Sequence, residues 1–320
     1  MTVTWTLGAE DVARIRFAFS PLWELVASLR TLQDPARQSI HLPWIKAVRP
    51  RLDALDLQEL FALVPQSGYL ADFITPPPDT PLPDFAAELD RVRRSPPEAV
   101  AREALEVKGT DPAVIARIAA DPVAARERVA DALLAYWEQC FAEYWPRVYA
   151  LLERDVLRRS RQLAQGGARE LFAALDPAVN WTGKQLIIDR PWCNTGEGLH
   201  GDGLVLMPTA FYWPSVAVMS APYQSTLVYP VLGVGTLWEE GPPPAPGALA
   251  ALIGRSRAQI LLALGEPTTT SALAGRMALT PGAVSQHLGV LTGGGLAVGM
   301  RVGKQVVYRR TPTGDVLAGC

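Results

Sequence analysis

Cysteine is scarce in this chain, and several other signals are missing from it. The 320 residues include three cysteines, Cys140, Cys193 and Cys320, which are far apart and odd in number. This pattern excludes a disulfide framework and a cysteine-based zinc site. The sequence has no uninterrupted run of the roughly eighteen apolar residues that a membrane span needs, and its first residues lack the pattern of a secretory signal. We therefore expect a globular, cytoplasmic protein without membrane segments.

The net charge is also small, at −2 at pH 7, but it is divided unevenly along the chain. From Leu249 onward seven basic and two acidic residues give +5, whereas the remaining 23 basic and 30 acidic residues give −7. A compact basic segment on an acidic body is typical of a protein whose partner has a polyanionic backbone. A solvated basic face would produce the same balance, so the charge has to be read together with a motif.

Proline marks the predicted domain boundary. Residues 241–247 read GPPPAPG, and a stretch whose four prolines lack amide donors favours neither helix nor sheet. We predict an N-terminal region at 1–240 for dimerisation or effector sensing, a linker at 241–247, and a second domain at 248–320. A second proline-rich stretch, 75–83, is predicted to be a loop inside the first region.

Helical periodicity dominates residues 1–178, and strand-like patterns dominate residues 179–240. Ser20 and Pro21 open a predicted helix, and apolar residues recur every three or four positions from Val129 to Leu152, with Cys140 as a buried small hydrophobe. Strand-like runs follow at 185–188, 203–207, 215–219 and 226–231. These patterns predict an α+β fold in which a small, mostly antiparallel sheet packs on the helices.

The basic segment has the pattern of a helix-turn-helix. A first amphipathic helix at 249–264 ends at Gly265, a second begins near Thr270, and Thr280 followed by Pro281 forms an N-cap and a first-turn proline for a third. Three short helices with a tight turn before the third match helix-turn-helix geometry.

The outward face of the third helix suits the major groove of DNA. Its apolar positions Val284, Leu288 and Leu291 are predicted to be buried, which leaves small and hydrogen-bonding residues outside. Small residues let the backbone approach the bases, a glutamine offers the donor and acceptor that match adenine, and a serine bonds either base edges or phosphates. The predicted base contacts are Gly282, Ala283, Ser285 and Gln286.

The end of the segment predicts a wing. Two strand-like runs, 296–300 and 305–309, are joined by a turn that contains glycine and two cations. Such a tip neutralises phosphates, and DNA affinity then falls steeply with salt. For His287 a structural role within the fold is an equal alternative to a phosphate contact. The predicted contacts to the DNA backbone are Thr280, His287, Arg301, Lys304, Arg309 and Arg310.

The motifs TPGAVSQHLGVL, GGL and RVGKQVVYR resemble the recognition helix and wing of the arsenical-resistance repressor (ArsR) family. The resemblance covers about a fifth of the chain and implies a homodimer that represses transcription from short inverted repeats until a signal releases it. Metal sensors of that family often carry a cysteine pair in the preceding helix, whereas residues 271–277 read SALAGRM. Metal sensing at that position is therefore not expected, and no metal site is predicted.

The opening RIRFAFSPLWELVASLRTLQDPARQSIHLPW and the later LVYPVLGVGTLWE resemble the large N-terminal region of bacterial regulators that carry this kind of C-terminal unit. The resemblance implies no particular chemistry. We expect the controlling signal, such as a small-molecule effector, to act on this region.

One loop offers an enzymatic alternative. Cys193, Glu197, His200 and Asp202 lie close together in a glycine-rich stretch and could hold a metal or form a nucleophile pair. Their spacing matches no zinc or protease signature, and glycine with Asp and Asn is ordinary turn chemistry. The glycines also lack a phosphate-loop pattern, so no cofactor is expected.

Aromatic residues leave two readings open. Trp181, Trp192, Trp213 and Trp238 lie in the strand-forming region and could line a ligand pocket, although filling a core is the more ordinary use. The sequence as a whole predicts a DNA-binding transcription regulator, a repressor rather than an enzyme. The alternatives are an enzyme or metal-binding N-terminal domain with a DNA-binding appendage, and a winged helix used only for protein contacts.

Overall fold

The chain forms two compact units, Met1–Trp238 and Glu239–Cys320. The structure is a computed structural model and describes residues 2–189, 196–199, 201–238, 246–265, 267–277, 279–302 and 305–318. Of the predicted linker, residues 241–245 lie outside the described residues. Helix α10 (Pro246–Ile253) begins within the linker's predicted range, because a proline is readily accommodated in the first turn of a helix.

Helices make up most of the first unit, and local capping explains where several of them begin. The helix predicted from Ser20 and Pro21 is confirmed, since the Ser20 hydroxyl accepts a hydrogen bond from the Trp23 amide at 2.9 Å. The helices are α1 (Ala9–Ala13), α2 (Pro21–Gln33), η1 (Ser39–His41), α3 (Leu42–Leu52), α4 (Gln58–Leu63), η2 (Asp72–Ile74), α5 (Phe85–Arg93), α6 (Pro97–Glu106), α7 (Pro112–Ala120), α8 (Pro122–Tyr136), the π-helical turn η3 (Trp137–Phe141), α9 (Trp145–Ala173) and η4 (Val234–Thr236).

The strands of the first unit form two four-stranded sheets. One has the order β3-β4-β1-β5 and the other β2-β6-β8-β7, and each mixes parallel with antiparallel pairs. The strands are β1 (Thr2–Thr6), β2 (Arg16–Phe17), β3 (Val179–Trp181), β4 (Gln185–Asp189), β5 (Gly196–Gly198), β6 (Val205–Thr209), β7 (Ala217–Met219) and β8 (Thr226–Pro230). Together with the helices they confirm the predicted α+β class.

The predicted division into a helical part at 1–178 and a sheet-rich part at 179–240 needs one correction. Strands β1 and β2 lie within the first of these ranges. Val3 and Trp5 are buried on one face of β1 while the threonines between them are half-buried, which is the period-two pattern of a strand. β1 pairs antiparallel with β4, with Val3 opposite Ile188, so its partner lies far along the sequence.

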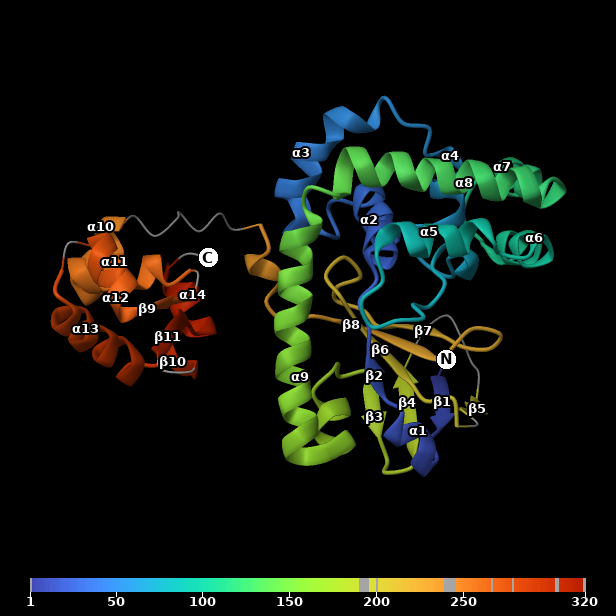
Figure 1. The fold of residues 1–320 in the computed structure, drawn as a ribbon. Coiled ribbons are helices and arrows are strands. Elements are labelled where there is room, and N and C mark those ends of the chain that lie inside the picture. The colour runs from blue at the N-terminus through green and yellow to red at the C-terminus, as the bar shows by residue number, and fades with distance from the viewer. Residues whose placement is uncertain are drawn as a thin grey trace. The chain divides into compact units, whose positions relative to one another are not determined.

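Two hydrophobic cores hold this unit together. The larger lies among the helices and includes Leu22, Trp44 and the buried Cys140, as predicted for that cysteine. The smaller lies around the sheets and includes Trp5 and Phe172. Figure 1 shows α3 to α8 gathered at one end of the unit and the strands at the other, with α9 running alongside both. Helix α9 is kinked at Gly167, where φ is +65°.

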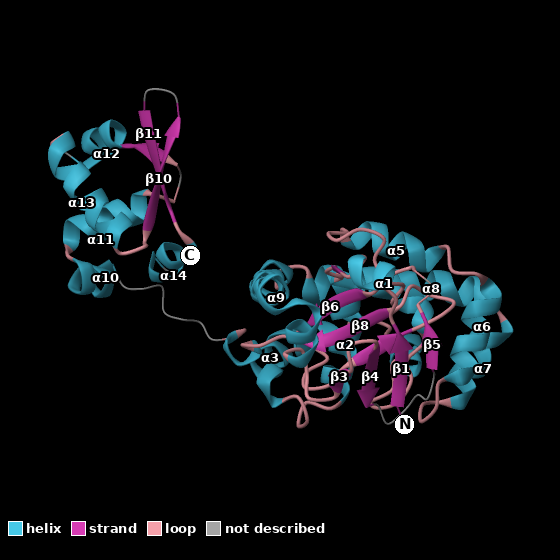
Figure 2. Ribbon diagram, turned by 90° about the horizontal axis from the view of Figure 1, so that it is seen from below, coloured by secondary structure: helices cyan, strands magenta, loops and turns pink. Residues whose placement is uncertain are grey.

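The second unit contains short helices and a three-stranded sheet. Its elements are α10, α11 (Arg255–Ala263), β9 (Thr268–Thr269), α12 (Thr270–Met277), α13 (Pro281–Gly293), β10 (Ala297–Val302), β11 (Gln305–Arg310) and α14 (Pro312–Ala318). The predicted first helix at 249–264 is divided, because Gly254 adopts φ +86° between α10 and α11. Figure 2 shows the hairpin of β10 and β11 standing beside the helices. Strand β9 adds a third strand to β11, with Thr269 opposite Val307.

Candidate nucleic-acid interface

Helix α13 is positioned by the residues that begin it. The Thr280 hydroxyl accepts a hydrogen bond from the Ala283 amide at 3.3 Å, and Pro281 occupies the first turn, as the sequence predicts. The helix ends at three glycines, of which Gly295 has φ +71°, a conformation that side chains with a Cβ rarely adopt. Strand β10 starts directly after this turn, so the cap and the glycines together set the helix against the hairpin.

One face of α13 packs into the core of the domain. Val284 and Leu288 are fully buried and Leu291 is nearly so, which confirms the predicted apolar face. These side chains belong to the same hydrophobic cluster as Ile260 of α11 and Leu273 of α12. Because this face is occupied, the opposite face of α13 is turned to solvent.

The outward face of α13 consists of small and hydrogen-bonding residues. Gly282, Ser285, Gln286 and Gly289 are exposed, and Ala283 is half-buried. A Cβ added to Gly282 or Gly289 would meet no atom within 4 Å, so packing within the domain does not require either glycine. A glycine in an exposed helix costs about 1 kcal/mol relative to alanine. Their presence here favours an external partner that approaches the helix backbone closely.

One residue of this face was missed by the sequence reasoning. Val290 is 50% exposed and lies one helical turn after Gln286. An aliphatic side chain at this position matches the methyl group that thymine presents in the major groove. Its spacing from Ser285 and Gln286 in the sequence was the available signal. His287 is half-buried at the margin of the face, so its two predicted alternatives both remain predictions.

The cationic side chains of the hairpin differ in their exposure to solvent. Arg301 on β10 and Arg309 on β11 are exposed, and Lys304 lies outside the described residues. Arg310 is the exception, because its side chain is only 10% exposed and its Nε lies 2.8 Å from the Asp315 carboxylate. This ion pair joins β11 to α14, and the guanidinium also lies against Gly265. The structure therefore gives Arg310 a place inside the domain, and its contact with DNA stays a prediction.

The loop considered as an enzymatic site is mostly outside the described residues, including Cys193, His200 and the side chain of Glu197. Asp202 is exposed. The carboxylate of Asp11 accepts hydrogen bonds from the amides of Gly201 and Gly203 at 2.8 and 3.2 Å, which holds this turn against α1. Among the residues that the structure describes, no group of three or more His, Cys, Asp or Glu side chains is arranged to hold a metal ion.

His41 is a packing residue. It is fully buried, its ring stacks on Phe211 with 4.3 Å between ring centroids, and its Nδ1 accepts a hydrogen bond from the Trp238 indole at 2.9 Å. Burial lowers the pKa of His41 from 6.5 to about 4, so the ring is neutral at physiological pH.

The four tryptophans of the strand-forming region were predicted either to fill a core or to line a ligand pocket. Trp181 and Trp238 pack against the two cores, whereas Trp213 is 36% exposed and lines a pocket. Trp192 lies outside the described residues.

Helix α13 packs against two other helices, presents small and polar residues to solvent, and is followed by a cationic hairpin. This arrangement defines a winged helix-turn-helix domain that binds DNA. Comparison with known families agrees: residues 252–299 match a helix-turn-helix domain family, and residues 110–235 match a family of unknown function (DUF5937). The protein is thus a DNA-binding transcription regulator with an ArsR-type helix-turn-helix domain after a large N-terminal domain.

No curated protein and no solved structure matches the chain. Within the described part of the chain, none of the helices combines the length and the apolar character that crossing a membrane requires.

Proposed function

We propose that this protein is a homodimeric, cytoplasmic repressor that reads a short inverted repeat with α13 and is released from DNA by a signal bound in the N-terminal unit. The observation that carries the DNA-reading part is the outward face of α13, where Gly282 and Gly289 serve no packing need and flank Ser285 and Gln286. In this reading the N-terminal unit binds its signal and does not transform it chemically.

The residues of the interface divide into two roles. Gln286 pairs with an adenine, Ser285 bonds a neighbouring base edge, and Gly282 and Ala283 allow the close approach. The phosphates are contacted by Arg301, Lys304 and Arg309 of the wing, together with His287. Thr280 accepts the Ala283 amide and keeps its own hydroxyl proton to donate to a phosphate.

Exposed apolar side chains support the homodimer. Leu252 of α10 and Val316 of α14 are each 71% exposed. Both helices belong to the second unit but lie outside α13 and the hairpin, the elements expected to contact DNA. A second copy packed against α10 and α14 would remove both side chains from water. A dimer also matches the two-fold symmetry of an inverted repeat.

The test begins with the selection of an operator by the full chain from a pool of random duplexes. We expect Gln286→Ala to weaken binding to the selected site by about tenfold, the loss of one bidentate base contact, and to leave binding to random duplexes nearly unchanged. Arg301→Ala should weaken binding to both. An equal loss on specific and random duplexes from Gln286→Ala would contradict the base contact.

The direction of regulation needs a separate measurement. A reporter gene placed behind the selected operator should be expressed more strongly when the chain is absent. Weaker expression without the chain would make the protein an activator and would leave the base contacts unaffected.

A further inference from the structure

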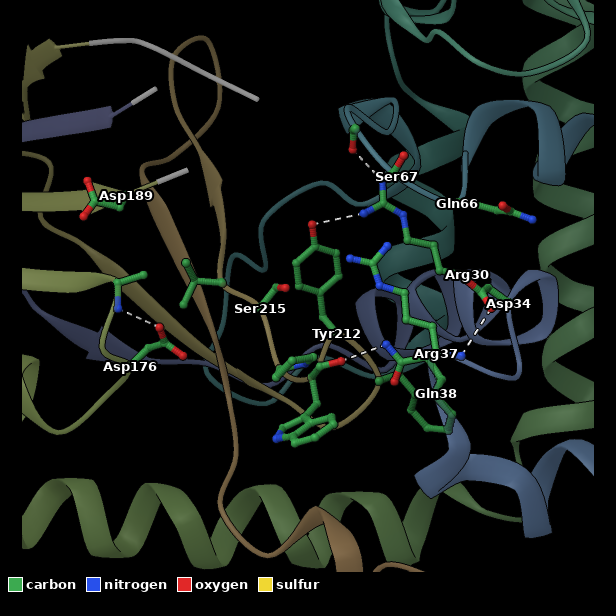
Figure 3. A pocket seen from close by; sticks show the side chains of 16 residues that line it. Arg30, Asp34, Arg37, Gln38, Gln66, Ser67, Asp176, Asp189, Tyr212 and Ser215 are labelled. Carbon is green, nitrogen blue, oxygen red and sulfur yellow. Dashed lines mark hydrogen bonds between the residues drawn. The ribbon is translucent and has the colours of Figure 1, made fainter. Parts of the chain in front are cut away.

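The N-terminal unit contains a pocket of about 330 Å³ beside the C-terminal end of α2. Its walls come from α2 and the loop after it, from the segment that follows β6, and from the ends of β3 and β4 (Figure 3). The volume is at the lower end of the range for small-molecule sites, so the pocket suits a small metabolite.

One side of the pocket carries two arginines without an anionic partner. Arg30 donates to the Tyr212 hydroxyl at 3.0 Å and to the Gly68 carbonyl at 2.6 Å, and its buried Nε has no hydrogen-bond partner. Arg37 is exposed, and neither guanidinium forms an ion pair with a described residue. Figure 3 shows the two guanidinium groups next to each other. The Asp34 carboxylate lies on the same side and accepts a hydrogen bond from the Arg37 amide at 3.2 Å, but it forms an ion pair with neither guanidinium. Two positive charges against one negative charge leave this side with a net positive charge, which attracts an anion.

The opposite side of the pocket is acidic. Asp176 accepts the Ala178 amide at 2.8 Å, and Asp189 accepts the Thr2 hydroxyl at 3.4 Å. Neither carboxylate forms an ion pair with a described cation. In Figure 3 both lie across Tyr212 and Ser215 from the two arginines, so these two carboxylates are separated from the arginines by the width of the pocket, whereas Asp34 lies on the arginine side.

The wall between these sides is held in place by hydrogen bonds. Gln38 donates from its Nε2 to the Trp213 carbonyl at 2.8 Å, and its buried Oε1 has no partner among the described residues. The Tyr212 amide donates to the Thr209 hydroxyl at 3.2 Å. The backbone of Tyr212 and Trp213 is thus held in place before any ligand arrives, which reduces the entropy lost on binding.

We propose that this pocket binds a small amphoteric molecule, with a carboxylate or phosphate against Arg30 and Arg37 and a protonated amine facing Asp176 and Asp189. Tyr212 and Trp213 lie along the middle of the ligand. The further step of identifying this ligand as the effector of the regulator rests on the proposed function. The binding of such a ligand is argued from the pocket alone.

The test is binding of defined probes to the full chain, followed by the fluorescence of Trp213 and its neighbours or by calorimetry. The amphoteric probes are 4-aminobutyrate, 6-aminohexanoate and O-phosphoethanolamine, and the one-ended controls are butyrate, butylamine and inorganic phosphate. At least one amphoteric probe should bind about tenfold more tightly than its one-ended controls, because one charged contact is lost in each control. The preferred probe distinguishes carboxylate from phosphate.

Matched variants locate the binding. Arg37→Gln and Asp189→Asn should each weaken the preferred probe by about tenfold. Arg49→Gln and Asp53→Asn change exposed residues outside the pocket and should have no effect. Absence of binding by every amphoteric probe, equal binding of the one-ended controls, or equal behaviour of pocket and control variants would each overturn the proposal.

DNA binding of the same variants separates this inference from the proposed function. Without a probe, Arg37→Gln should bind the selected operator as the unchanged chain does. A chain that binds the operator but none of the probes refutes only the pocket. A chain that binds a probe but no duplex refutes the regulator and leaves the pocket in place.

Discussion

At the scale of single residues, buried carboxyl groups stand out around α2. Glu24 is fully buried and accepts hydrogen bonds from the amides of Ala210 and Phe211 at 3.0 and 3.2 Å. Glu88 is also fully buried and accepts the Leu22 amide at 2.9 Å. Burial raises the pKa of Glu24 from 4.5 to about 7 and that of Glu88 to about 8. Both carboxyl groups are therefore more readily protonated in the folded chain than in the unfolded one.

This difference predicts how stability depends on pH. An unfolded Glu24 loses its proton near pH 4.5, whereas the folded one keeps it until about pH 7, so the free energy of unfolding decreases between these values. The Glu24 contribution is on the order of 3 kcal/mol. Glu24→Gln cannot ionise and should flatten the decrease between pH 4.5 and 7. His41, whose pKa is lowered to about 4, acts in the opposite direction below pH 6.5.

The measurement is denaturant unfolding followed by tryptophan fluorescence, because all nine tryptophans lie in the first unit. Glu98→Gln is the control, since Glu98 is exposed on α6. Its profile should match that of the unchanged chain, whereas Glu24→Gln should keep only the slope from Glu88 and from Asp72, whose pKa burial raises to about 7. A Glu24→Gln profile as steep as the control would refute the raised pKa.

The neighbouring residues Arg309 and Arg310 should respond differently to the same substitution. Arg309 is exposed on the wing, so Arg309→Gln should lower the slope of log affinity against log salt by about 0.9, the contribution of one phosphate contact. Arg310 is paired with Asp315, so Arg310→Gln should instead lower the thermal stability of the second unit. DNA titrations at several salt concentrations and thermal melts followed by circular dichroism measure the two effects. A lowered salt slope with unchanged stability in Arg310→Gln would place that side chain on DNA.

At the scale of the element, the glycines of α13 lower the stability of the helix and leave its backbone accessible. Gly282→Ala or Gly289→Ala should stabilise the helix by roughly 0.5–1 kcal/mol, because alanine loses less backbone entropy and neither Cβ meets an atom. The same methyl group should weaken operator binding, since it stands between the helix and the bases. Hydrogen exchange of α13 amides and operator titrations report the two quantities.

Gly275 of α12 provides the matched control for this experiment. It is an exposed helical glycine whose added Cβ would also meet nothing within 4 Å. Gly275→Ala should stabilise its helix in the same way and leave DNA affinity unchanged. If alanine at 282 and 289 also leaves affinity unchanged, α13 does not approach the bases closely.

The elements also show which parts of the fold a local sequence pattern can predict. Thr280 and Pro281 specify the start of α13 through contacts made within four residues, so a local pattern was sufficient to predict it. Strand β1 depends on pairing with β4, and Gly254 divides the first helix of the second unit through its own φ of +86°. Neither follows from apolar periodicity, because distant pairing and glycine geometry do not appear in a local window.

At the scale of the whole molecule, the sequence predicted the helices and the hairpin of the DNA-binding domain but not the pocket of the first unit. The interface comes from one continuous stretch, with the exception of Arg310, whose ion pair with Asp315 required the fold. The pocket joins Arg30 and Arg37 to Asp176 and Asp189, which are far apart in the chain. Single arginines and aspartates carry no recognisable spacing, and only the packing of α2 against the strands brings them together.

The central place of β1 in its sheet has a consequence for how the chain is made. β1 lies between β4 and β5, and both partners come more than 170 residues later. During synthesis this sheet therefore has to wait until nearly the whole first unit has left the ribosome. The winged helix emerges afterwards, so the first unit can complete its fold before the part that recognises DNA has been made.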